Sequence, residues 1–161
     1  MLNIDNFIRL FQGAVKDCWD RPALSDFRKS TITYCGLAER IETLDIIWKK
    51  AGLKPGDKIG INTKSSALGA SVFMAAVSKG YVAVHLYNAF TPADTQRLVN
   101  HSDSKILYTE KRTFDEMNFD EMPQVLCVIC SSRSGSGCGN SPPLPGTSVS
   151  RGRYRGRKQE P

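Results

Sequence analysis

The sequence predicts an α/β fold with three layers, a mainly parallel sheet and crossover helices, followed by a disordered tail. Three observations in the 161-residue chain support this prediction. Residues 53–108 alternate between β-type and helical patterns with only short connections between them. Parallel strands need such crossover helices. The helical run 67–77 is apolar or small on every side, as expected for a helix between a sheet and another layer. After residue 130 the composition changes abruptly to Gly, Ser and Pro.

The first fifty residues predict a helix, a hairpin and a second helix. Apolar side chains recur at helical spacing over residues 3–18, and we expect this helix to pack onto a sheet. Two short β-runs at residues 21–26 and 30–34 flank a polar turn, which predicts a hairpin. Residues 36–51 predict an amphipathic helix, whose apolar face contains Leu37, Ile41, Leu44, Trp48 and Ala51.

The centre of the chain predicts the parallel sheet itself. Apolar β-runs occur at residues 58–62, 82–86, 105–108 and 125–130. Helices are predicted between them at residues 67–77, with Ser65 or Ser66 as the N-cap, and at residues 92–101. An acidic, irregular connection is expected over residues 110–123.

Charge is distributed unevenly along the chain, whose formal net charge is +6. Residues 1–130 contain 16 Lys and Arg and 15 Asp and Glu, whereas residues 131–161 contain 6 Lys and Arg and one Glu. The near-neutral body therefore gives no reason to expect specific nucleic acid or an anionic membrane as a partner. No run approaches the roughly 18 apolar residues of a transmembrane segment, and no basic region opens the chain as in a secretory signal. We therefore expect a cytoplasmic protein.

Two domains are expected, a folded piece at residues 1–130 and a disordered tail at residues 131–161. Gly, Pro and Ser make up 17 of the 31 tail residues, so the tail has too little apolar surface to offset its chain entropy. The abrupt change suggests the hypothesis that a shifted reading frame produced the tail. Its Arg-Gly-rich end at residues 151–158 is similar to short RNA-binding segments. An alternative function is therefore a small non-enzymatic α/β module that binds nucleic acid weakly.

Four stretches resemble the AMP-forming acyl-CoA synthetases, the adenylate-forming superfamily. They are Ile32-Thr-Tyr-Cys-Gly-Leu37, Ala51-Gly-Leu-Lys-Pro-Gly-Asp-Lys-Ile59, Val77-Ser-Lys-Gly-Tyr-Val-Ala-Val-His-Leu86 and the pair of runs at residues 90–94 and 98–105. The Val99-Asn-His-Ser102 sequence is similar to the long-chain fatty acid CoA ligase branch. The resemblance covers about residues 4–130. It implies that residues 1–130 are a partial N-terminal subdomain of the AMP-binding domain.

The resemblance implies a reaction in two steps. A fatty acid carboxylate attacks the α-phosphate of ATP in the presence of Mg²⁺, and the CoA thiol then displaces AMP from the acyl-adenylate. The family places its Gly/Ser/Thr-rich phosphate loop and its catalytic lysine downstream of the stretches found here. Ser131–Gly139 is Gly- and Ser-rich but lacks the Pro-Lys-Gly that completes such a loop. We therefore expect this chain alone to be inactive and to bind none of ATP, Mg²⁺ and CoA.

No catalytic, cofactor-binding or metal-binding residue is assigned from the sequence. The five cysteines form no framework, and we expect reduced thiols. Cys127 and Cys130 have C-x-x-C spacing within an apolar β-run, which favours core thiols over a redox or zinc site. His85 is expected to be a partly buried, hydrogen-bonded side chain, and His101 to lie at a helix end, where a cation suits the dipole.

Overall fold

The computed structural model describes residues 4–27, 31–131 and 147–150. Two strands, β1 (Pro22–Ser25) and β2 (Thr31–Thr33), form the antiparallel hairpin that the sequence predicts. A second sheet has the order β4-β3-β5-β6-β7. Its strands are β3 (Lys58–Asn62), β4 (Val82–His85), β5 (Ile106–Glu110), β6 (Cys127–Ser131) and β7 (Thr147–Ser150). Neighbouring strands from β4 to β6 are parallel, and β7 is antiparallel to β6, so the predicted mainly parallel sheet is confirmed.

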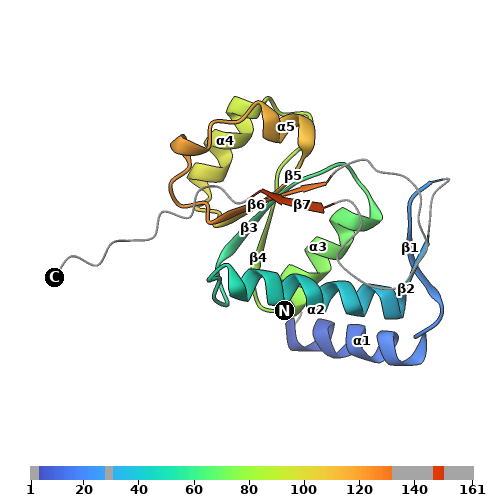
Figure 1. The fold of residues 1–161 in the computed structure, drawn as a ribbon. Coiled ribbons are helices and arrows are strands. Elements are labelled where there is room, and N and C mark those ends of the chain that lie inside the picture. Colours follow the sequence, from blue (N-terminus) through green and yellow to red (C-terminus); the bar gives the residue numbers. More distant parts are fainter. Residues whose placement is uncertain (1–3, 28–30, 132–146, 151–161) are drawn as a thin grey trace.

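Helices cover both faces of this sheet and give the predicted three layers (Figure 1). One face carries α2 (Tyr34–Lys50) and α3 (Ala67–Ser78), and the other carries α4 (Pro92–His101) and α5 (Lys111–Asp115). Two clusters of buried apolar side chains separate accordingly. The first contains Trp48, Val72, Ile59, Ile61, Ile106, Tyr108 and Ile129, and the second contains Leu86, Val99, Leu107, Val128 and Cys130.

The helix α2 begins and ends where local chemistry requires it. Its N-cap is Thr33, whose hydroxyl accepts a hydrogen bond from the Gly36 amide at 3.2 Å. After its end, Gly52 has a φ of 92°, a conformation that favours glycine. The buried Asp45 carboxylate accepts hydrogen bonds from Lys49 at 2.7 Å and from the Tyr81 hydroxyl at 3.2 Å. This carboxylate therefore ties the C-terminal half of α2 to the chain that follows α3.

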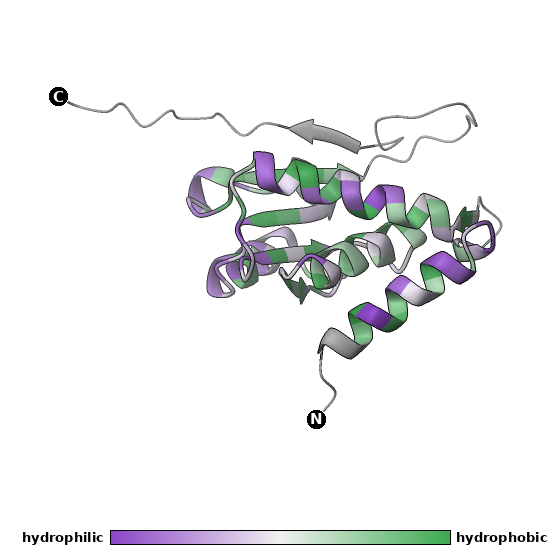
Figure 2. Ribbon diagram, turned by 90° about the horizontal axis from the view of Figure 1, so that it is seen from below, coloured by the Kyte–Doolittle hydropathy of each residue, from purple (hydrophilic) through white to green (hydrophobic). Residues whose placement is uncertain are grey.

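The apolar helix α3 is buried, as its composition predicts. Val72, Ala75 and Ala76 are fully buried, and α3 packs against α2, β3 and β4. Figure 2 shows the mostly hydrophobic strands beside it, whereas α1 (Ile4–Asp17), next to the N label, alternates between hydrophobic and hydrophilic residues. No helix among the described residues is long and apolar enough to cross a membrane.

Three features differ from the sequence-based expectations. The prediction that α1 packs onto the sheet is wrong, because α2 already covers that face and α1 packs against α2 instead (Figure 1). The connection after β5 is not wholly irregular: it contains α5 and a short 3-10 helix, η1 (Phe119–Glu121). Part of the tail, Thr147–Ser150, pairs with β6 as β7. The expected disorder of the rest of the tail, residues 132–146 and 151–161, lies outside the described residues.

Candidate functional site

The order of the strands points to one edge of the sheet as a candidate site. From β3 the chain passes through α3 to β4 on one side of β3, and then through α4 to β5 on the other side. Because α3 and α4 lie on opposite faces, the connections change face at the carboxyl ends of β3 and β5, which we call the switch point (Figure 1). Ligands of open α/β sheets bind at such reversals, so the switch point is the candidate functional site.

Two charged residues, Lys64 and Glu110, meet at the switch point. Lys64 follows β3, and its backbone amide donates a hydrogen bond to Glu110 Oε1, at the end of β5, at 3.3 Å. The Lys64 ammonium lies 3.9 Å from Glu110 Oε2. An ion pair this long and this exposed adds little stability. A carboxylate or phosphate ligand could therefore compete for Lys64 at small cost.

The N-terminus of α3 follows the end of β3, but its partial positive charge is already neutralised. The Ser66 hydroxyl accepts a hydrogen bond from the Gly69 amide at 3.1 Å, and the Asp26 carboxylate accepts one from the Ala67 amide at 2.7 Å. Ser66 is thus the cap, one of the two residues predicted. A cavity of about 320 Å³ adjoins these groups, lined by Leu24, Ser25, Asp26, Phe27, Ser65, Ser66, Ala67 and Ala70. Because a carboxylate occupies the helix end, a nucleotide phosphate does not fit there.

Buried polar groups lie in β3 and β5 close to the switch point. On the α4 face, Asn62 Nδ2 donates a hydrogen bond to Thr95 Oγ1 at 3.1 Å. The hydroxyls of Tyr108 and Thr109 are also buried, and neither has a hydrogen-bond partner among the described residues. Burial raises the pKa of Tyr108, and burial lowers the pKa of the nearby Arg40 guanidinium. Buried polar groups usually have a hydrogen-bond partner, so these two hydroxyls are exceptions among the described residues.

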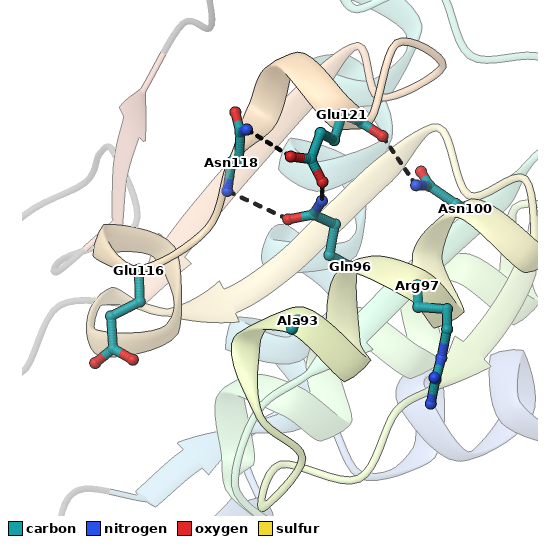
Figure 3. Close-up of a pocket in the computed structure, with 7 residues that line it drawn as sticks. All are labelled: Ala93, Gln96, Arg97, Asn100, Glu116, Asn118 and Glu121. Atoms are coloured by element: carbon teal, nitrogen blue, oxygen red, sulfur yellow. Dashed lines mark hydrogen bonds between the residues drawn. The ribbon is translucent and has the colours of Figure 1, made fainter.

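A second cavity, of about 410 Å³, lies between α4 and the connection that contains η1 (Figure 3). The Glu121 carboxylate accepts hydrogen bonds from Gln96 Nε2 and from Asn118 Nδ2. The Glu121 carbonyl accepts one from Asn100 Nδ2 at 2.9 Å, and Gln96 Oε1 accepts one from the Asn118 amide at 3.3 Å. These polar groups bond to one another, so the cavity is a structural junction that holds η1 against α4. Sequence reasoning missed it, because its only signal was the pair of amides at Gln96 and Asn100, one helical turn apart.

The cysteines predicted as core thiols lie in the sheet. Cys127 packs with the cluster on the α2 and α3 face, and Cys130 with the cluster on the α4 face. Because the two side chains point to opposite faces of β6, they do not come together as a metal or redox site. Burial raises the pKa of Cys130 to about 11, and it also raises that of Cys127. Cys138 lies outside the described residues.

The histidines do not form a catalytic group either. His85 ends β4 and is exposed, so the expected partial burial is wrong; the centroid of its ring lies 5.2 Å from that of the Phe73 ring. The hydrogen bond expected for His85 is not found among the described residues. The contact found there is with the Phe73 ring. His101 is exposed in the last turn of α4, as predicted. Within the described residues, no cluster of His, Cys, Asp or Glu side chains could hold a metal ion.

The comparison with protein families agrees with this architecture. A model of the AMP-binding enzymes matches residues 10–145 of the chain. The chain belongs to this family. The oxalate–CoA ligase of Arabidopsis thaliana is 29% identical over 111 residues, which are 68% of this chain and 22% of that enzyme. The resemblance seen in the sequence is thus confirmed at the level of the family.

Solved structures share the fold. The chain is similar to apo MatB from Rhodopseudomonas palustris, with a TM-score of 0.68 and 22% identity over 81% of this chain and 26% of that one. It is also similar to a Mycobacterium tuberculosis fatty acyl CoA synthetase, with a TM-score of 0.68 and 16% identity over 80% of this chain and 26% of that one. The chain therefore spans about a quarter of the length of these relatives.

Proposed function

We propose that this chain is the N-terminal portion of an ATP-dependent long-chain fatty acid CoA ligase. The observation that carries the proposal is the family match over residues 10–145, together with coverage of only about a quarter of the related chains. The whole ligase would form an acyl-adenylate from a fatty acid and ATP with Mg²⁺, and then a thioester with CoA. In this proposal residues 1–130 are the adenylating-domain piece, residues 131–161 are a tail of which Thr147–Ser150 pairs with β6, and the protein acts in the cytoplasm.

The piece would contribute one wall of the adenylating site. The switch point at the carboxyl ends of β3 and β5 offers the Lys64 cation, and near it the buried hydroxyls of Tyr108 and Thr109 have no hydrogen-bond partner among the described residues. The helix end beside it already holds the Asp26 carboxylate, so this helix end does not bind a phosphate. The phosphate-binding groups would therefore come from the remaining part of the enzyme.

On this proposal the 161-residue chain has no adenylating activity of its own. Preorganised donors and cations stabilise the charge that develops as a phosphoryl or acyl group is transferred. Loss of a single such donor costs about 10²–10³ in rate, and here the entire phosphate loop and the catalytic lysine of the family have no counterpart in the sequence.

The fatty acid assignment rests on the Val99-Asn-His-Ser102 sequence at the end of α4 and is finer than the family assignment. Oxalate is the substrate named for the Arabidopsis relative, and a fatty acyl group is named for the M. tuberculosis structure. The substrate class must therefore be determined directly.

A chimera tests both parts of the proposal. Residues 4–130 would replace the corresponding quarter of the M. tuberculosis synthetase, and exchange of pyrophosphate into ATP would be measured with palmitate, octanoate and oxalate. We expect exchange that depends on palmitate. The control is the same enzyme carrying a parallel-sheet segment from an unrelated doubly wound protein, which should be inactive. A folded chimera that binds ATP but shows no exchange with any acid would contradict the proposal.

A further inference from the structure

The strand β4 forms one edge of the sheet, and half of its backbone groups are unpaired. Among the described residues, β4 pairs only with β3. The amide of Val82 donates to the Asp57 carbonyl and that of Leu86 to the Ile61 carbonyl, each at 2.9 Å. Backbone groups alternate in direction along a strand, so the N–H and C=O groups of Ala83 and His85 point away from β3.

Nothing in β4 protects this edge. Natural edge strands usually carry charged side chains, Pro or a bulge that prevents pairing with another chain. The sequence Val82-Ala-Val-His85 has no Pro, Lys, Arg, Asp or Glu, and the register of β4 with β3 is regular. The Val82 side chain is 45% exposed, and the exposed rings of Tyr87 and Phe90 pack together just beyond the strand, 5.6 Å apart.

We propose that β4 pairs antiparallel with β4 of a second copy of this chain, with the two-fold axis beside Val84. Ala83 then lies opposite His85 of the partner copy in a hydrogen-bonded pair, and the symmetric pair completes the ladder. Every outward N–H and C=O of Ala83 and His85 in both copies gains a partner. Two sheets join into one continuous sheet.

The edge is suited to its own copy because it is self-complementary. In this register Val82 lies opposite Leu86 of the partner copy, and both side chains are on the α4 face, where Leu86 belongs to the buried cluster. The exposed Val82 side chain is thereby covered. The body of the chain is nearly neutral, so two copies repel each other little. An isologous contact uses the same edge of both copies, so it closes at two copies. This inference does not depend on the proposed function.

The first test is the mass of the full chain in solution. Size-exclusion chromatography with light scattering, at about 50 μM and in reducing buffer, should give twice the monomer mass of 17.8 kDa. A monomer at this concentration, or a distribution extending beyond two copies, would overturn the proposal.

Two matched cysteine variants test the register. In the proposed pairing the Cα atoms of the two Val84 residues lie about 4.5 Å apart, as in a pair without direct hydrogen bonds, which is within disulfide range. The two Val82 residues lie four positions out of register, about 14 Å apart. Under mild oxidation, Val84→Cys should form a dimer linked through residue 84, identified by mass spectrometry of its peptides, whereas Val82→Cys should not form its own link. Equal crosslinking of the two variants would rule out this register.

A proline variant tests the edge hydrogen bonds. Ala83→Pro removes an N–H that points away from β3, so the native sheet loses no hydrogen bond while the proposed interface loses two symmetric ones. The variant should elute as a monomer at concentrations where the parent chain is a dimer, with an unchanged far-ultraviolet circular dichroism spectrum. A folded Ala83→Pro variant that remained a dimer would contradict the proposal.

Discussion

A matched pair of Tyr→Phe substitutions tests how the hydrogen bonding of two buried hydroxyls affects the stability of this fold. Tyr108 and Tyr81 are both buried, but their hydroxyls differ. The Tyr108 hydroxyl has no hydrogen-bond partner among the described residues, whereas the Tyr81 hydroxyl donates to Asp45 Oδ1 at 3.2 Å. Removing the two hydroxyls should therefore change the free energy of unfolding in opposite directions.

The magnitudes follow from the cost of unpaired groups. A buried polar group without a partner costs about 1–3 kcal/mol, and Phe leaves only a small gap in place of the oxygen, so Tyr108→Phe should stabilise the chain by about 1 kcal/mol. A hydrogen bond to a charged group contributes about 1.5–3 kcal/mol. Asp45 keeps its bond to Lys49, so Tyr81→Phe should cost about 1.5 kcal/mol, near the lower limit.

Equilibrium urea unfolding, followed by circular dichroism at one fixed protein concentration, measures both values. The expected result is a higher midpoint for Tyr108→Phe and a lower midpoint for Tyr81→Phe, with unchanged slopes. A loss of more than about 1 kcal/mol for Tyr108→Phe would show that its hydroxyl has a partner, and would refute the reasoning.

Three further results are expected. At pH 8, iodoacetamide should modify Cys130 at least about 100-fold more slowly in the folded chain than in urea. The reason is that burial raises the pKa of Cys130 from 9.0 to about 11 and so lowers its thiolate fraction. Equal rates would contradict the burial of Cys130. Gly69→Ala places a Cβ 2.7 Å from Thr63 Oγ1, so this variant should lose about 1 kcal/mol of unfolding free energy in urea melts, and adding Thr63→Ala should recover it. Hydrogen bonds from Lys105 and from a backbone amide hold the pKa of Asp57 in the folded chain below its ordinary value of 3.8. The stability that Asp57 contributes is therefore present above pH 3.8 and is lost as the pH falls through the folded-state pKa. Urea melts should therefore show the stability advantage of the parent over Asp57→Asn to be constant from pH 7 to 5 and smaller at pH 3; an advantage that grew on acidification would contradict the sign.

The central strands and helices could be predicted because their hydrophobic patterns match the faces that they bury in the fold. The strand at residues 58–62 and the helix at residues 92–101 have the bounds that the sequence predicts. Gly52 and Ser66 act at helix ends as their chemistry requires. The family itself was visible as a series of short motifs in the correct order, which the match over residues 10–145 confirms.

The remaining features depend on contacts between distant residues, which a single sequence does not display. The junction around Glu121 requires Gln96, which is 25 residues earlier in the chain and has an ordinary helical pattern. The position of α1 depends on α2 having already covered the sheet. The strand β7 is short, and its pairing depends on the open side of β6 rather than on a strong pattern of its own. The switch point likewise follows from strand order, which becomes known only once the strands are paired.

The most direct test of the central claim is the adenylation activity of the 161-residue chain itself. The purified chain would be incubated with ATP, Mg²⁺, labelled pyrophosphate and palmitate, beside an intact fatty acyl-CoA synthetase as the positive control. We predict no exchange of label into ATP above the background without enzyme, because on the proposed function the phosphate-binding groups would come from the remaining part of the enzyme. Palmitate-dependent exchange by the chain alone would contradict the account.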